Sequence, residues 1–214
     1  DDIDVVINAA AWTNVDGAET PEGRRATWQA NSTGPAVLAR EATAHGVTMV
    51  HISTEYVFDG TQNVHLEDEA PSPLGAYGQS QAGGDAAVAS TPKHYIVRTS
   101  WVVGDGKNFL KTMASLADQG ISPSVVSGQV GRLTFTSDLA RGIIHLLTTG
   151  AEFGTYNLSG EGPVMSWAQV AKRVFELRGR NPEDVTPVTT EEYFAGREVA
   201  PRPLSSVLDL TKIK

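Results

Sequence analysis

Short apolar runs alternate with longer amphipathic segments along the chain, and this alternation restricts the fold more than any other feature. The apolar runs have the length of strands and cover residues 3–10, 47–53 and 94–100. A continuous apolar run is typical of a strand that is buried on both faces. The segments between and after these runs have helical spacing and cover residues 21–45, 74–89 and 108–119. Strands that alternate with helices predict an α/β fold with a doubly wound parallel sheet.

The second half of the chain is less regular than the first. Its predicted strands are short and cover residues 123–127 and 155–159, and its predicted helices cover 137–147 and 166–178. We therefore expect a larger lobe over residues 1–120 and a smaller lobe over 121–214, with a boundary that is approximate because the lobes interleave.

Composition excludes several classes of protein. The formal net charge is −8, which argues against a nucleic-acid partner because such proteins need a basic face. The chain has no cysteine, so disulfides, cysteine-bound zinc and a thiol nucleophile are excluded. No apolar run approaches the roughly 20 residues of a membrane span. We expect no membrane partner and a reducing, cytoplasmic location.

Several motifs of known chemistry are missing from these residues. There is no Gly-rich turn between a strand and a helix, and the similar run Gly128-Gln129-Val130-Gly131 is interpreted as a loop. Walker A, H-E-x-x-H and G-x-S-x-G motifs are also absent, and the five histidines lack the spacing of metal ligands. The chain opens with Asp1-Asp2 and enters an apolar run at once, so we expect it to be part of a longer polypeptide.

Three strand ends are candidate parts of a binding site, because ligands of open α/β sheets bind beyond the carboxyl ends of the strands. These ends cover residues 8–13, 53–56 and 98–101. Tyr77 and Gln81 lie four residues apart in a predicted helix and therefore share one of its faces.

The segments around these strand ends resemble the dTDP-4-dehydrorhamnose reductases, a family of the extended short-chain dehydrogenase/reductase superfamily. The resemblance runs from about residue 4 to residue 212, and its motifs follow one another in the same order. They read N-A-A-A-W-T-N-V-D at 8–16, S-T-E-Y-V-F-D-G at 53–60, Y-G-Q-S-Q at 77–81, R-T-S-W at 98–101, N-F at 108–109, D-L-A at 138–140, L-S-G-E-G at 158–162 and R-P-L-S-S-V-L-D at 202–209.

The resemblance implies a fold and an activity. The fold is a Rossmann-like doubly wound sheet that lacks its N-terminal strands, with a partial dinucleotide-binding domain over residues 1–120 and a mainly substrate-binding lobe over 121–214. The implied reaction uses NADPH or NADH to reduce the 4-keto group of dTDP-4-dehydro-6-deoxy-L-mannose to dTDP-L-rhamnose, in nucleotide-sugar and cell-wall polysaccharide biosynthesis. The implied partner is the dTDP-sugar, and a homodimer and a fusion to an epimerase domain both stay open.

The resemblance also implies roles for individual residues. The implied catalytic residues are Thr54, Tyr77 and Gln81. The implied cofactor-binding residues are Ala9, Ala10, Ala11, Tyr77 and Gln81. The implied substrate-binding residues are Thr13, Thr54, Glu55, Trp101 and Arg202. Without the resemblance, Trp101 would be interpreted as a core or interface residue and Arg202 as an exposed surface residue.

The sequence departs from the family pattern in two ways that leave an alternative open. The segment with the family's Gly-rich turn is absent from these residues, and Gln81 stands where the family has a lysine. Glutamine can hydrogen-bond a ribose hydroxyl but supplies no positive charge. Both departures favour a non-catalytic regulatory or binding protein of the same fold, like the regulatory subunit of methionine adenosyltransferase. The presence of Thr54, Tyr77 and Trp101 favours an enzyme.

Overall fold

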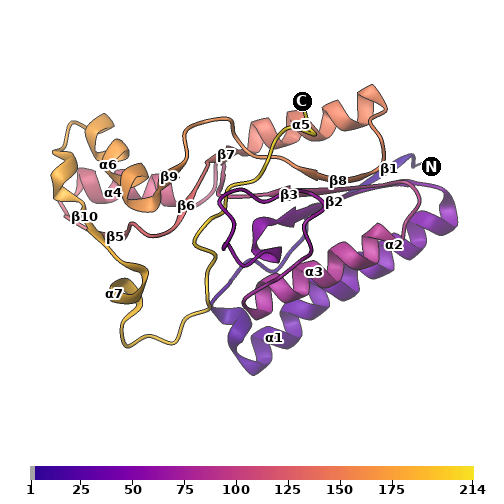
Figure 1. Ribbon diagram of the computed structural model, residues 1–214, viewed down its shortest axis with the longest axis horizontal. Coiled ribbons are helices and arrows are strands. Elements are labelled where there is room, and N and C mark those ends of the chain that lie inside the picture. The colour runs from indigo at the N-terminus through magenta and orange to yellow at the C-terminus, as the bar shows by residue number, and fades with distance from the viewer. Residues whose placement is uncertain (1–2) are drawn as a thin grey trace.

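A four-stranded parallel sheet forms the centre of the larger part of the molecule (Figure 1). The computed structural model describes residues 3–214. The strand order is β1-β2-β3-β8, and all three neighbouring pairs are parallel. The four strands are β1 (Val5–Asn8), β2 (Thr48–Thr54), β3 (His94–Thr99) and β8 (Gly154–Asn157).

Helices cover both faces of this sheet. On one face lie α1 (Pro21–Trp28), α2 (Gly34–His45) and α3 (Ala76–Ala89), and on the other lies α5 (Thr136–Thr149) (Figure 1). The expected helix over 21–45 is continuous but contains a π-helical segment, Gln29–Thr33, between α1 and α2. The predicted doubly wound α/β fold is therefore confirmed.

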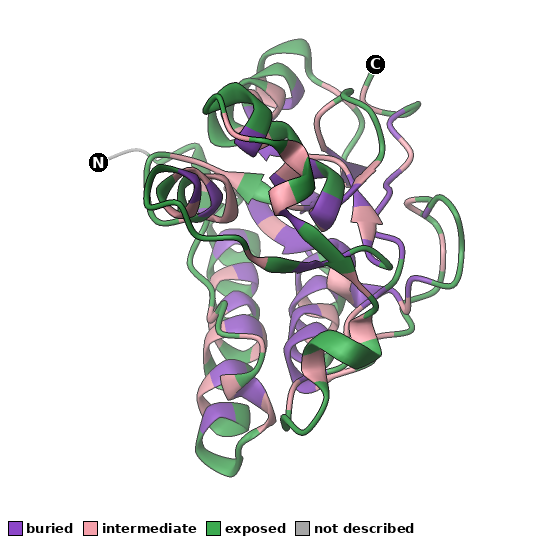
Figure 2. Cartoon of the chain, turned by 90° about the vertical axis from the view of Figure 1, so that its left-hand side faces the viewer, coloured by how far each residue is buried: buried purple, intermediate pink, exposed green. Residues whose placement is uncertain are grey.

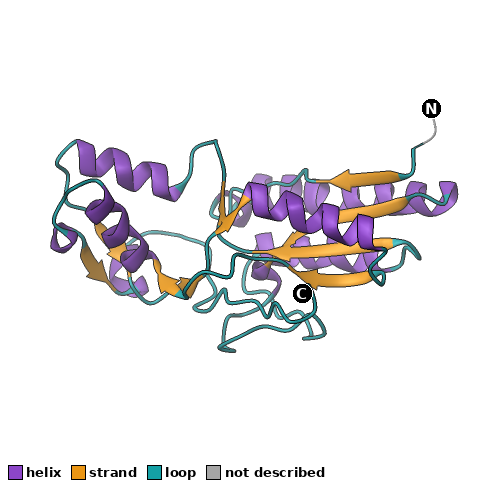
Figure 3. Ribbon diagram, turned by 90° about the horizontal axis from the view of Figure 1, so that it is seen from above, coloured by secondary structure: helices purple, strands orange, loops and turns teal. Residues whose placement is uncertain are grey.

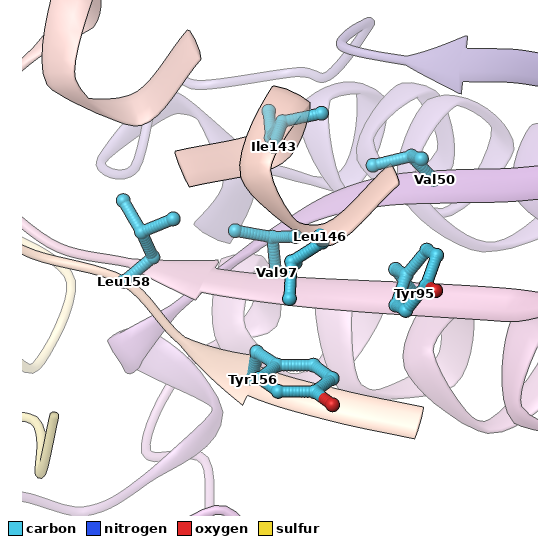
Figure 4. Packing of buried hydrophobic residues seen from close by; sticks show 7 residues of the cluster. All are labelled: Val50, Tyr95, Val97, Ile143, Leu146, Tyr156 and Leu158. Atoms are coloured by element: carbon cyan, nitrogen blue, oxygen red, sulfur yellow. The ribbon is translucent and has the colours of Figure 1, made fainter. Parts of the chain in front are cut away.

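Neighbouring residues of β2 explain why both faces need a cover. Met49 packs with α2 and α3, in a cluster that includes Ala39 and Val88. Val50 points the other way and packs with Ile143 and Leu146 of α5 (Figure 4). Because successive side chains of a strand point to opposite faces, an apolar run such as this one must be buried on both sides.

The smaller part of the molecule lies beside the sheet and has its own apolar core (Figures 1 and 3). Phe175 and Val185 are fully buried in this core. Its main elements are α4 (Phe109–Asp118), β5 (Ser124–Val126), α6 (Trp167–Leu177), β10 (Thr186–Val188) and α7 (Thr190–Phe194). The α6 helix begins after Ser166, which forms a capping box with Gln169 and so satisfies backbone N–H groups at the helix start.

Two pairs of two-residue strands lie between the parts. They are β4 (Val102–Val103) with β7 (Thr134–Phe135), and β6 (Val130–Gly131) with β9 (Met165–Ser166). The loop prediction for residues 128–131 was therefore wrong for Val130 and Gly131. The partner of β6 is more than thirty residues away in sequence, so no local pattern reveals this pairing.

Chain order and spatial order differ in the second half. Strand β8 and helix α5 follow residue 120 but belong to the main sheet and its cover. Buried residues gather where the helices face the sheet (Figure 2). None of the helices within residues 3–214 combines the length and apolar character that crossing a bilayer requires. The division of the chain at residue 120 stays a prediction.

Candidate active site

A cavity of about 540 Å³ lies at the carboxyl ends of the central strands, where the two parts of the molecule meet. The end of β2 contributes Ser53 and Thr54 to its wall, and the segment after β3 contributes Ser100 and Trp101. Trp167, at the start of α6, closes the wall from the smaller part. The strand ends therefore meet at one site, as the sequence predicted.

Most of the predicted site residues line this cavity. Those that do are Ala9, Ala11, Thr13, Thr54, Glu55, Tyr77, Gln81 and Trp101, whereas Ala10 and Arg202 do not. The backbone N–H of Ala10 donates to Oδ1 of Asn8 at 3.2 Å.

Tyr77 lies in the first turn of α3 and is 8% exposed. Burial raises the pKa of its phenol to about 12, and the nearby Glu55 carboxylate adds to the rise. The side chains of Thr54 and Gln81 act in the opposite direction because they favour the ionised phenol. Tyr77 therefore carries its proton throughout the neutral pH range.

Gln81 lies one turn after Tyr77 and is 2% exposed. Its amide Nε2 donates to the Tyr77 hydroxyl at 3.4 Å. Its Oε1 is buried and accepts no hydrogen bond from any protein group within residues 3–214. A buried amide oxygen without a donor is costly, so this atom is a candidate acceptor for a ligand hydroxyl or amide.

Thr54 and Glu55 form a buried hydrogen-bonded pair beside Tyr77. Oγ1 of Thr54 donates to Oε2 of Glu55 at 2.8 Å. Burial raises the pKa of the Glu55 carboxyl to about 7, although the hydroxyls of Thr54 and Ser206 oppose the rise. This site therefore holds a carboxyl group that titrates near neutral pH, next to a phenol that does not.

Trp101 has an unusual backbone and a specific packing partner. Its φ of 46° makes it the one residue other than glycine with a positive φ in the part of the chain that the structure describes. Its ring stacks on Trp167 with the centroids 3.6 Å apart and the planes 12° apart. A backbone held in this region is strained, and such strain concentrates at functional sites.

Comparison with known proteins connects this site with one family. The model of the family described as RmlD substrate binding domain matches residues 1–214. The dTDP-4-dehydrorhamnose reductase of Aggregatibacter actinomycetemcomitans is 37% identical, and the match covers 98% of this chain and 74% of that protein. The chain belongs to the dTDP-4-dehydrorhamnose reductase family. The resemblance noted in the sequence is thereby confirmed.

Other reductases of the family match to a similar degree. The dTDP-4-dehydrorhamnose reductase of Mycobacterium tuberculosis H37Rv is 37% identical over 89% of this chain, and the chain spans 64% of that protein's length. The crystal structure of the Bacillus anthracis reductase in complex with NADP is 36% identical, with a TM-score of 0.89, and the match covers 97% of this chain and 72% of that one. These matches confirm the Rossmann-like α/β fold.

One buried residue of this reductase-family chain supports the site and was missed in the sequence. Asn31, in the π-helical segment, accepts from the backbone N–H of Trp12 at 2.8 Å and donates to its carbonyl at 3.1 Å. It also donates to Oγ of Ser80 at 3.1 Å, and Ser80 in turn donates to the carbonyl of Tyr77. Asn31 thus ties the segment after β1 to the helix that carries Tyr77. No sequence signal marks it, because it lies within a segment of helical spacing.

Trp167 was also missed as a cavity residue of this reductase-family chain. Its place directly after the cap Ser166 could be predicted, but its stacking on Trp101 depends on how the two parts of the molecule meet. Gly131 makes room for this stack, since a Cβ on Gly131 would lie 2.7 Å from Cε2 of Trp101.

Arg202 is held away from the cavity wall by Asp16. Its Nη2 donates to both carboxylate oxygens of Asp16 at 2.9 Å. Burial favours the neutral form of Asp16, but the hydrogen bonds from Arg202 and Ala200 outweigh it and lower its pKa. The predicted role of Arg202 in substrate binding stays a prediction, and in this family member its observed contact fixes the C-terminal segment on the segment after β1.

Proposed function

We propose that the complete polypeptide catalyses the NAD(P)H-dependent reduction of the 4-keto group of dTDP-4-dehydro-6-deoxy-L-mannose to dTDP-L-rhamnose. The observation that carries this proposal is the convergence of Thr54, Tyr77 and Gln81 on one cavity in a chain of this family. The relatives with the names quoted above are reductases of this type. The product would enter nucleotide-sugar and cell-wall polysaccharide biosynthesis in the cytoplasm.

Two observations fit a nicotinamide dinucleotide at this cavity. Oε1 of Gln81 is a buried acceptor that could receive a ribose hydroxyl. Ala9 and Ala11 line the same cavity with small side chains, which lets a cofactor lie close to the backbone. The proposed cofactor residues are Ala9, Ala10, Ala11, Tyr77 and Gln81. When bound, the reduced cofactor would supply hydride to C4 of the sugar.

Protein side chains would bind the oxygen of the reacting carbonyl and protonate it. The Thr54 hydroxyl would hold this oxygen by donating a hydrogen bond. Tyr77 would donate its proton to the same oxygen as it becomes an alkoxide, and a phenol with a pKa of about 12 carries that proton at neutral pH. The amide of Gln81 would stabilise the phenolate through its hydrogen bond at 3.4 Å.

The remaining cavity residues would select the substrate. Trp101 offers an aromatic surface to the sugar, and Thr13 and Glu55 offer polar groups beside it. Arg202 would contact the nucleotide diphosphate only after it leaves Asp16. We include in the proposal a dinucleotide-binding role for residues 1–120, a mainly substrate-binding role for 121–214, and an assembly that is either a homodimer or a fusion to an epimerase domain.

The neutral Gln81 favours a second candidate function, that of a binding or regulatory protein. In that case the cavity would hold a sugar nucleotide or dinucleotide without turnover. The two functions differ in one measurable property, because only the enzyme consumes reduced cofactor in proportion to the sugar product.

The test is a turnover assay of the complete polypeptide. NADPH or NADH and dTDP-4-dehydro-6-deoxy-L-mannose are supplied together, and cofactor absorbance and the sugar nucleotides are followed in parallel. We expect equal amounts of oxidised cofactor and dTDP-L-rhamnose. Binding of both ligands with no product above the level of the Tyr77→Phe variant would overturn the enzyme proposal in favour of the binding protein.

A further inference from the structure

The hydrogen bond between Thr54 and Glu55 limits what Thr54 can do in the reaction. Oγ1 of Thr54 donates to Oε2 of Glu55 at 2.8 Å, and both residues line the cavity. A hydroxyl group has one proton to donate. While that proton is given to a Glu55 carboxylate, it is not available to the carbonyl oxygen of a substrate.

The surroundings of Glu55 favour its neutral form. Glu55 is 4% exposed, and it makes no ion pair within residues 3–214. The titratable groups that face it are Tyr77 on α3 and the adjacent Tyr56, both of which are neutral phenols. Thr54 and Ser206 supply only hydroxyls. Burial without a cation disfavours a carboxylate.

The nearest candidates for a compensating cation do not supply one to Glu55. Arg202 acts on the neighbouring Tyr56, but its guanidinium is engaged by Asp16. Gln81, one turn after Tyr77 on α3, lines the same cavity and is neutral. No positively charged group within residues 3–214 is among those that act on the Glu55 carboxyl group.

We propose that Glu55 is a positioning residue that works as a carboxylic acid and turns the Thr54 hydroxyl toward the substrate. In this form the Glu55 O–H donates to Oγ1 of Thr54, and the Thr54 proton is free to donate to the carbonyl oxygen. Ionisation of Glu55 reverses the hydrogen bond and withdraws the Thr54 proton from the substrate. No proton is transferred in the positioning itself. The inference rests on the proposed function, because it takes the Thr54 hydroxyl as the donor to the carbonyl.

The kinetic test compares pH profiles of the complete polypeptide, its Glu55→Gln variant and a matched Glu41→Gln variant at an exposed position. A glutamine amide donates to Oγ1 of Thr54 at every pH. Wild type and Glu41→Gln should lose about tenfold in kcat/KM between about pH 6 and pH 8, as one carboxyl group ionises. The kcat/KM of Glu55→Gln, whatever its absolute value, should change by less than about twofold over the same range.

Two results would overturn the proposal. One is a Glu55→Gln variant that folds but has low activity at every pH, and whose residual activity declines with pH as wild type does. Glu55 would then act as a carboxylate. The other is a wild-type profile without a decline near neutral pH. If Glu55→Gln does not fold, Thr54→Val supplies a second comparison, since its residual activity should lack the decline when the hydroxyl is gone.

Infrared spectroscopy separates this proposal from the proposed function, because it needs no turnover. The carbonyl band of a protonated carboxyl group should be present in wild type at about pH 6, disappear by about pH 8, and be absent from Glu55→Gln. Absence of that band in wild type would overturn the assignment to Glu55 even in an active enzyme. A wild type that shows the band but makes no product would contradict the proposed function alone.

Discussion

The amide nitrogen of Gln81 lies 3.4 Å from the phenol oxygen of Tyr77, so the buried phenol has a neutral hydrogen-bond donor one helical turn away. A hydrogen bond from an amide favours the phenolate less than a cation does. Burial raises the pKa of Tyr77 to about 12, and the hydrogen bond from Gln81 offsets only part of this rise. Such a phenol is suited to donate a proton during reduction and poorly suited to remove one during oxidation.

Replacing Gln81 with lysine should raise the reductase rate. A cation beside Tyr77 lowers the pKa of the phenol and stabilises the phenolate left after proton donation, so we expect kcat to increase by about tenfold or more. The measurement is steady-state oxidation of NAD(P)H with the sugar substrate. Gln81→Met is the control, because it has a similar length but neither charge nor hydrogen bond, and it should be slower than wild type. Equal rates for wild type and Gln81→Lys would contradict this view of the site.

Removing the Tyr77 hydroxyl should abolish most of the activity without loss of the fold. Tyr77→Phe keeps the ring that packs edge-on against Tyr56 at 5.2 Å but has no proton to donate. We expect kcat to fall by about 10²–10⁴-fold with nearly unchanged affinity for the ligands. Tyr95→Phe is the matched control in the core, where the hydroxyl donates to the carbonyl of Ala151. It should cost about 1 kcal/mol of stability and leave kcat unchanged.

Glu55 should make the folded state less stable as the pH rises. Its pKa is about 7 in the folded protein against an ordinary value of 4.5, so the folded state binds a proton that the unfolded state has already released. The stability that this group contributes is complete below about pH 4.5 and is lost as the pH rises through about 7, and the loss is about 3 kcal/mol. Chemical denaturation at about pH 5 and pH 8 measures this effect.

The Glu55→Gln variant identifies the carboxyl group responsible. From about pH 5 to about pH 8, the free energy of unfolding of wild type should fall by about 3 kcal/mol more than that of Glu55→Gln. Glu41→Gln should show the same fall as wild type. If Glu55→Gln lost as much stability as wild type over this range, the folded-state pKa of Glu55 would have to be near its ordinary value.

Adding a methyl group at Gly131 should disturb the part of the cavity wall that Trp101 forms. A Cβ there would lie 2.7 Å from Cε2 of Trp101, so the indole must move. We expect Gly131→Ala to raise KM for the sugar nucleotide by about tenfold and to cost about 1–3 kcal/mol of stability. Gly162→Ala is the control, because a Cβ at Gly162 meets no atom within 4 Å. A Gly131→Ala variant whose tryptophan fluorescence changes while its KM stays unchanged would exclude Trp101 from sugar binding.

The strands of the main sheet could be predicted because each is a local apolar run. The run 47–53 became β2 (Thr48–Thr54), and the run 94–100 became β3 (His94–Thr99). The two-residue strands could not be predicted, since β6 depends on its pairing with Met165 and Ser166 and on a bridge from Val130 to Ser205. Burial on both faces leaves a local pattern, whereas pairing between distant short segments leaves none.

The candidate site was predictable to the extent that its residues lie at strand ends or share a helix face. Thr54 is the last residue of β2 and Trp101 comes shortly after β3, and Tyr77 and Gln81 are spaced by one helical turn. Asn31 and Trp167 were missed because their contacts depend on the packing of separate segments. Arg202 was predicted as a site residue from its sequence motif, but the motif did not reveal that Asp16 binds its side chain.

Transfer of deuterium is the most direct test of the central claim, that this cavity belongs to a reductase. The complete polypeptide is given reduced cofactor labelled with deuterium at the transferable position of the nicotinamide, together with dTDP-4-dehydro-6-deoxy-L-mannose. The expected product is dTDP-L-rhamnose with deuterium at C4, and Tyr77→Phe should not form this product. A protein that binds both ligands and leaves the sugar unlabelled would contradict the central claim.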